Sequence, residues 1–241
     1  MTSPAVQDLW VYLATSPLFW LGLTLAAYLG ADAIAAATGR HPLANPVLMA
    51  VATVCIVLFA TGTSYPTYFS GAQFVHVLLG PATVALAIPI IRNRAAIRRD
   101  LRALVGALVV GSATGVASAI GIAVLCGGSE VLVRSVAPKS VTAAIAMGVS
   151  REAGGLPELT AVVVIATGIT GAVLVTPLMN ALRLRDWRAR GFAVGLAAHG
   201  IGTARALQVH PLAGTFAALA MALNGVMTAF LTPVLLRVMG G

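Results

Sequence analysis

Apolar runs long enough to cross a membrane dominate the chain and limit the folds open to it. A spanning helix needs about 20 mostly apolar residues, and six runs approach or exceed this length: 18–37, 46–62, 104–126, 159–182, 191–207 and 215–236. Two more, 69–91 and 131–149, are long enough but are interrupted by Gly80-Pro81 and Pro138-Lys139. Because lipid offers no partners to unpaired backbone groups, helices are the expected elements. We predict an all-α polytopic membrane protein with about six to eight transmembrane segments, two of them broken or re-entrant.

Composition excludes a soluble domain and a nucleic-acid-binding protein. Hydrophobic residues form 59% of the 241 residues and charged residues only 9%, against about 25% charged in soluble domains. The net charge of +8 comes from basic residues that lie between the apolar runs, so they are topology signals. Cys55 and Cys126 lie inside apolar runs without metal-ligand spacing, and we predict no disulfide framework, metal site or cofactor. The lipid bilayer is the expected surrounding.

The arginines predict the orientation of the chain. Nine of the fifteen basic residues fill two short loops, 92–102 and 183–190, which places both loops on the cytoplasmic side of the membrane. Run 104–126 then leads outward, 159–182 returns, 131–149 dips in from outside as a hairpin, and the last helix ends inside at Arg237. Run 69–91 either crosses or forms a second hairpin. The first ten residues contain no Lys or Arg, so we expect no cleaved signal peptide.

An internal repeat favours the hairpin for run 69–91. Segments 80–88 and 137–145 match at a constant offset of 57. The matched pairs are Pro81 with Pro138, Thr83 with Ser140, Val84 with Val141, Ala87 with Ala144, and Ile88 with Ile145. The chain leaves the first copy towards the arginine loop and reaches the second from outside, so the copies would be inverted, as in secondary transporters. We predict one domain over 1–241, with repeat-like units at 46–91 and 103–150 followed by helices 159–182, 191–207 and 215–236.

Lys139 is the strongest candidate for a ligand-binding residue. It is the only lysine and follows the proline that breaks a membrane segment. A cation at bilayer depth costs about 2.5–3.5 kcal/mol on insertion scales, so it should face a cavity, a partner or a substrate. The amides of Ser140, Val141 and Thr142, with the hydroxyls of Ser140 and Thr142, would form a helix N-terminus, which attracts anions. The alternative is a lysine that snorkels to the outer interface.

A second candidate lies in residues 198–206. Arg205 could be another anion clamp, with His199, Gly202 and Thr203 within two turns of it, and the glycines of this segment permit a local break. An interfacial Arg205 is an equal alternative, because the residue is close to the predicted helix end. His199 could carry a proton or donate a hydrogen bond between helices.

These motifs resemble those of a known family. The stretches LLGPATVALAIP, SVAPKSVTAAIAM, GGLPELTAVVVIATGITGA and AHGIGTARA (78–89, 135–147, 154–172 and 198–206) resemble successive signatures of the LrgB/CidB family. The resemblance runs from about 45 to 235. The family was named for holin-antiholin-like control of murein hydrolases and autolysis, and it includes the plant plastid glycolate/glycerate translocator. Bacterial members are associated with pyruvate and related monocarboxylates, usually beside a small LrgA/CidA-type membrane protein.

The resemblance implies a set of substrate-binding residues on the family's motif positions. They are Pro138, Lys139, Ser140, Thr142, His199, Gly202, Thr203 and Arg205, to which the repeat adds Pro81 and Thr83. Two acids of the family pattern are missing, one after the PKSVT motif, where Ala143 to Gly148 follow, and one after TARA, where Gln208 follows. A coupling scheme that uses those acids for a proton or sodium ion is therefore not carried over.

Two function classes remain after the search for chemistry. The first is a carrier that translocates a small monocarboxylate such as glycolate, glycerate, pyruvate or lactate. The second is a holin-like regulator that alters envelope integrity without moving a defined solute. A pore does not need a lysine at a helix break, which favours the carrier. An enzyme is not expected, since no acid–base or nucleophile constellation is present. A carrier without its LrgA-type half would self-associate or bind such a partner.

Overall fold

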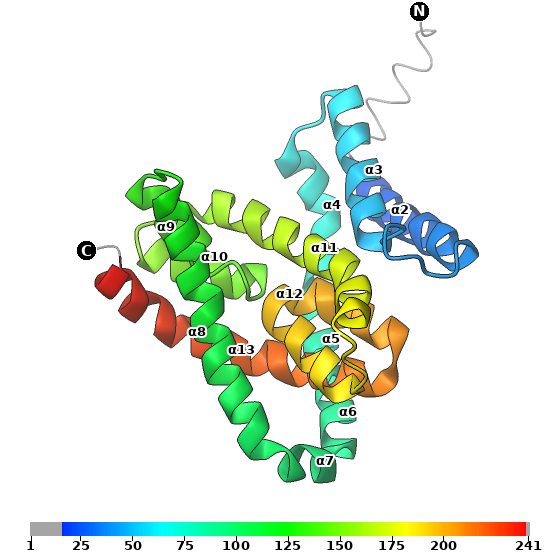
Figure 1. Cartoon of the computed structure of the whole chain (residues 1–241). Helices are drawn as coiled ribbons and strands as arrows, with labels where there is room; N and C mark the ends of the chain where they lie inside the picture. The colour runs from blue at the N-terminus through cyan, green and yellow to red at the C-terminus, as the bar shows by residue number, and fades with distance from the viewer. Residues whose placement is uncertain (1–15, 240–241) are drawn as a thin grey trace, which may run out of the picture. The chain divides into compact units, whose positions relative to one another are not determined.

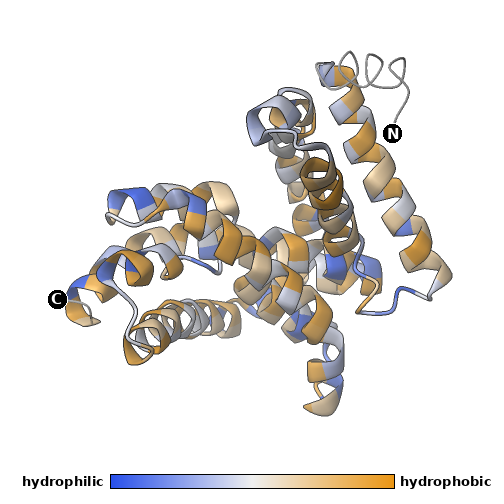
Figure 2. Cartoon of the chain, turned by 90° about the horizontal axis from the view of Figure 1, so that it is seen from above, coloured by the Kyte–Doolittle hydropathy of each residue, from blue (hydrophilic) through white to orange (hydrophobic). Residues whose placement is uncertain are grey.

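The computed structural model describes residues 16–239, and all of its regular elements there are helices (Figure 1). The N-terminal residues on which the signal-peptide prediction rests lie outside this range. Five helical stretches among the described residues are long and apolar enough to cross a membrane: Pro17–Ala37, Tyr65–Arg92, Leu101–Leu125, Pro157–Ala181 and Pro211–Met239. Figure 2 shows hydrophobic residues along the length of the helices, and large apolar side chains such as Phe59 and Leu125 are exposed. The predicted all-α membrane fold is confirmed.

The chain forms two compact units that meet in sequence at Ala85 and Leu86. The first unit holds α2 (Pro17–Ala37), α3 (Pro46–Thr61), α4 (Tyr65–Val77) and α5 (Leu79–Ala85). Trp20 of α2 is fully buried and makes an edge-to-face contact with Tyr68 of α4, whose hydroxyl lies 3.1 Å from Thr24 Oγ1. The Asn45 side chain accepts hydrogen bonds from the amides of Val47 and Leu48, so it caps α3 as an Asn-Pro pair should.

The interruption in run 69–91 lies slightly earlier than predicted. Helix α4 ends at Val77 and α5 begins at Leu79, two residues before the predicted break at Gly80-Pro81. Pro81 lies in the first turn of α5, where a missing amide proton requires no partner. The predicted inverted relation between 46–91 and 103–150 joins segments of different units and stays a prediction.

The second unit contains the remaining helices. They are α6 (Ala87–Arg92), α7 (Arg94–Arg99), α8 (Leu101–Leu125), α9 (Glu130–Val136), α10 (Ala143–Glu152), α11 (Pro157–Ala181), α12 (Trp187–Val209) and α13 (Pro211–Met239). An ion pair of 2.7 Å between Arg188 and Asp100 ties the start of α12 to the start of α8. We call this the arginine end of the unit, because both arginine-rich loops meet there.

Helices α9 and α10 form a hairpin that enters from the end of the unit opposite the arginine end. Thr160 Oγ1 contacts both Ser135 O of α9, at 2.9 Å, and Ser150 Oγ of α10, at 2.7 Å. A continuous helix would place residues 135 and 150 about 22 Å apart. The chain therefore reverses at 137–142, and the predicted break at Pro138-Lys139 is confirmed.

Helix α12 is a second hairpin, and it enters from the arginine end. Its backbone leaves the helical region at Ala198 and at His199, which has φ 41° and ψ −133°. The rings of Trp187 and His210 stack with centroids 4.8 Å apart, whereas a straight helix would separate them by about 34 Å. A Cβ on Gly202 would lie 2.9 Å from Val194 Cγ2, so the second half folds back along the first. The prediction of one crossing helix over 191–207 is wrong.

This reversal also changes the direction of the last helix. Helix α13 starts at the arginine end, where Phe216 packs with Leu104 of α8 in one core cluster. Near its end, Leu235 and Leu236 pack on a cluster that contains Ile120 of α8. Helix α13 thus runs parallel to α8, and Arg237 lies at the end opposite the arginine end. The prediction that Arg237 ends on the same side as the arginine loops is wrong, because it counted α12 as a crossing.

Candidate functional site

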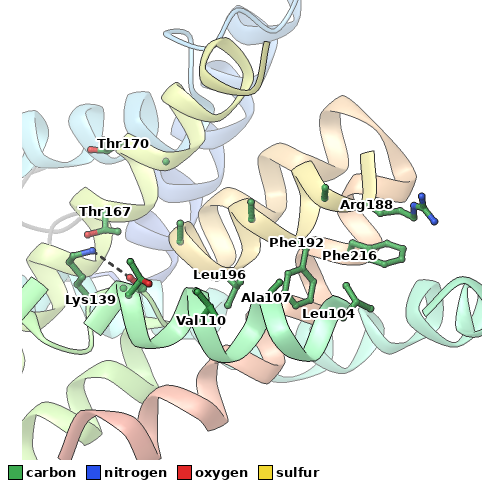
Figure 3. A pocket seen from close by; sticks show the side chains of 18 of the residues that line it. Leu104, Ala107, Val110, Lys139, Thr167, Thr170, Arg188, Phe192, Leu196 and Phe216 are labelled. Atoms are coloured by element: carbon green, nitrogen blue, oxygen red, sulfur yellow. Dashed lines mark hydrogen bonds between the residues drawn. The ribbon is translucent and has the colours of Figure 1, made fainter. Parts of the chain in front are cut away.

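A groove of about 1210 Å³ runs between α8 and α11 over the first half of α12 (Figure 3). Its walls are mostly apolar, with Leu104, Phe192, Leu196 and Phe216 among them. Polar groups concentrate at its two ends. Lys139 lies at one end and Arg188 at the other in Figure 3. The groove is therefore an apolar passage that leads from the arginine end to the break between α9 and α10.

The charged side chains that line the arginine end of the groove are paired with one another. Arg188 pairs with Asp100 at 2.7 Å and with Asp186 at 2.6 Å. The hydrogen bond from Arg188 lowers the pKa of Asp186 to about 2, so this carboxylate stays ionised at neutral pH. Both acids at this end are already paired with Arg188. Among its lining residues, this end therefore offers no unpaired positive charge to an anion.

The other end presents a cation and hydroxyls. Lys139 is half-buried and donates from Nζ to Ser140 Oγ at 3.5 Å. Thr167 and Thr170 of α11 line the groove beside it (Figure 3). Among the described residues, no ion pair joins Lys139 to an acid within 4.0 Å. Lys139 is thus the cation of the groove that lacks a carboxylate partner.

The depth of this end follows from α8. A Cβ on Gly115 would lie 3.5 Å from Ser140 Oγ, and Gly115 is the fifteenth residue of the 25-residue helix. Fourteen residues rise about 21 Å from Leu101, in a bilayer whose apolar core is about 30 Å thick. The Lys139–Ser140 segment therefore lies deep in the span, away from both ends of α8.

The helix that follows the break begins later than the sequence predicts. Helix α10 starts at Ala143 with Thr142 at its N-cap, whereas the expected N-terminus lay at Ser140. The amide of Val141 donates to Pro138 O at 3.3 Å, so a turn uses one of the amides that the sequence assigned to an anion. Pro138 and Val141 are buried, which packs this turn against the unit and leaves Lys139 facing the groove.

The second motif forms the break of α12. His199 is buried and donates from Nε2 to Val164 O at 3.0 Å, since a carbonyl can only accept. Thr203 donates to His199 O at 2.7 Å. A Cβ on Gly168 of α11 would lie 2.7 Å from the His199 ring, so that position must stay small. The break that the sequence allowed at Gly200 or Gly202 falls at Ala198–His199, and these groups hold it in place.

Only part of the predicted site lines the groove. Lys139 and Ser140 do, whereas Arg205 is on the second half of α12 and is absent from the lining. Pro81 and Thr83 are exposed on α5 and belong to the first unit. The role of Arg205, Pro81 and Thr83 in binding stays a prediction.

No sequence motif singled out the residue that joins the two helix breaks. Asn224 of α13 is 1% exposed and donates to Ser140 O at 3.2 Å and to Leu196 O at 2.9 Å. Its Oδ1 accepts from Ser112 at 2.6 Å and from Thr228 at 3.1 Å. The signal was present, because an amide in the middle of an apolar span is expensive without partners.

Comparison with known proteins gives a consistent match over nearly the whole chain. The model of the LrgB-like family matches residues 24–238. A holin-like protein CidB of Staphylococcus epidermidis is 32% identical over 197 residues, 82% of this chain and 86% of that protein. The uncharacterized protein YxaC of Bacillus subtilis is 34% identical over 215 residues, 88% of this chain and 91% of that protein. No solved structure is significantly similar to the chain.

Proposed function

The chain belongs to the LrgB-like family of multi-pass bacterial membrane proteins, and we propose that it is a secondary transporter of small monocarboxylates. The substrate is an anion of two or three carbons such as glycolate, glycerate, pyruvate or lactate. Its carboxylate binds Lys139 at the break between α9 and α10.

The observation that carries this proposal is the setting of Lys139. A lysine deep in the span has a high insertion cost, and here its ammonium faces the groove with no ion pair to an acid within 4.0 Å among the described residues. A substrate carboxylate supplies that balance. Ser140 and Thr170 offer hydroxyls for the keto or hydroxyl oxygen of the substrate, and the apolar walls suit its short carbon skeleton.

The two hairpins support a carrier. The α9–α10 hairpin follows the long helix α8, and the α12 hairpin follows the long helix α11. These two helix-plus-hairpin arrangements are similar, and their hairpins enter from opposite ends. Inverted units with discontinuous helices near the bilayer midplane are the usual architecture of secondary transporters, in which one unit rocks against the other. In the conformation described, the groove connects Lys139 with the arginine end, so we infer that the anion enters and leaves there in this state.

The second candidate function is a holin-like regulator of murein hydrolases and autolysis. It is favoured by the names of relatives, among them the holin-like CidB proteins of Staphylococcus epidermidis and Staphylococcus aureus. In either case we propose assembly with a small LrgA/CidA-type membrane protein or self-association, through helix faces rich in Gly and Ala. A proton or a sodium ion would couple transport in the carrier.

Counterflow in proteoliposomes separates the two functions. Vesicles loaded with unlabelled pyruvate, glycolate, glycerate or lactate are diluted into a trace of the same labelled acid. A carrier accumulates label transiently above equilibrium and saturates with substrate. A pore equilibrates the label without an overshoot, and that result for all four acids would refute the proposed transport.

A further inference from the structure

We propose that Asn224 is a positioning residue for the anion site: its amide fixes the Lys139–Ser140 turn relative to the groove wall by binding both helix breaks at once. The inference rests on the proposed function and names a residue that lies outside all four stretches that resemble the family's signatures.

The orientation of the amide follows from its partners. The side-chain nitrogen of Asn224 faces Ser140 O and Leu196 O, and both are backbone carbonyls that can only accept. The oxygen faces the hydroxyls of Ser112 and Thr228, which can donate. The reversed amide would place an oxygen against two carbonyls, so this assignment is determined by chemistry.

Each carbonyl belongs to a different break. Ser140 O lies in the turn between α9 and α10, outside either helix. Leu196 O lies in the last turn before the break at Ala198–His199, where carbonyls lose their regular helical partners. Unbonded carbonyls at this depth would be costly, because lipid and apolar side chains offer no donors. Asn224 supplies a donor to both hairpins.

Asn224 is linked to the anion site through Ser140. Ser140 accepts from Asn224 with its carbonyl and from Lys139 with its hydroxyl. Leu196 is part of the groove wall. The amide therefore links the turn that carries the cation to the wall that faces the substrate. Loss of both donors would let the turn and the wall move apart and would weaken anion binding.

The test measures counterflow kinetics of the parent, Asn224→Leu and Asn224→Ala, using the acid that the parent accumulates best. Leucine has a similar size without donors, and alanine avoids a steric clash if leucine does not fit. We expect the half-saturating concentration to rise about five- to hundredfold, the loss expected for two hydrogen bonds. The maximal rate per folded protein should change less than about threefold.

Ser112→Ala and Thr228→Val are the matched controls. Each removes one hydroxyl from the oxygen side of the amide and leaves both donors in place, so half-saturation should stay within about twofold of the parent. A general effect of loosened packing would move the controls as much as the Asn224 variants, and that result would overturn the inference.

The remaining outcomes are also decisive. Unchanged half-saturation in a folded Asn224 variant overturns the positioning role while transport by the parent stands. A fall in maximal rate alone overturns it too, because it assigns Asn224 to the conformational change. If neither variant folds, Asn224 is a structural residue only. A parent that accumulates none of the four acids refutes the proposed function itself.

Discussion

Replacing Lys139 by methionine tests the anion site most directly. Methionine keeps most of the length of the stem and removes the charge. The variant should insert and fold as well as the parent or better, because a cation at bilayer depth costs about 2.5–3.5 kcal/mol. The Lys139 ammonium donates one long hydrogen bond of 3.5 Å, to Ser140 Oγ, so its removal costs the folded protein little.

The expected loss of substrate affinity is large by comparison. A hydrogen bond to a charged group contributes about 1.5–3 kcal/mol, and 1.4 kcal/mol corresponds to tenfold in affinity. This range of free energy applies to Lys139 because its side chain is half-buried in an open groove. The half-saturating concentration for the monocarboxylate should therefore rise about 10- to 150-fold. Lys139→Arg should recover only part of the affinity, since a planar fork does not replace a compact ammonium.

The assay is counterflow over a range of substrate concentrations, normalised to the amount of folded protein. Arg237→Met is the control, because Arg237 lies near the end of α13, opposite the arginine end, and does not line the groove. It should transport like the parent. If Lys139→Met shows the half-saturation and rate of the parent at equal amounts of folded protein, the lysine does not bind substrate and the reasoning is refuted.

Three further predictions test the fold. Cysteines at Trp187 and His210, in a background without the native cysteines, should be joined by a short bifunctional reagent, because the two rings stack at 4.8 Å; the absence of a cross-link would favour a straight helix with about 34 Å between them. Asn45→Ala should cost about 0.5–2 kcal/mol through loss of the α3 cap, and an unchanged thermal midpoint would contradict this role. Gly195→Ala should lower the thermal midpoint because its Cβ meets the backbone of α13, whereas Gly106→Ala, with open space around it, should hold or raise it; equal midpoints would contradict the close approach of α12 and α13.

Local physics explains what could be predicted from the sequence. The length of the apolar runs set the helical membrane fold, since nothing but a helix satisfies the backbone of such a run in lipid. The Asn45-Pro46 cap and the break after Pro138 were also predictable, because each has a local cause. Each depends on groups within a few residues of chain, namely an accepting side chain near free amides and a proline without its amide proton.

The reversal of α12 had no such local cause. His199 takes a positive φ although it is not glycine, and the segment carries no proline. The conformation is held by the hydrogen bond to Val164 of α11 and by the close fit of Gly168 against the imidazole ring. Both partners are more than 30 positions away in the sequence, so hydropathy alone favoured a straight crossing.

The sequence alone thus determined the class of fold, the approximate ends of α2, α3, α8 and α11, the cation at a break, and the family motifs around it. Only the tertiary structure decided that two hairpins enter from opposite ends, that Lys139 lies at the deep end of a groove, and that Asn224 bonds both breaks. The physical reason is the distance along the sequence over which each kind of interaction acts. Propensity, capping and hydropathy act between near neighbours, whereas the network at Asn224 joins Ser112, Ser140, Leu196 and Thr228, most of which meet only when separate helices pack.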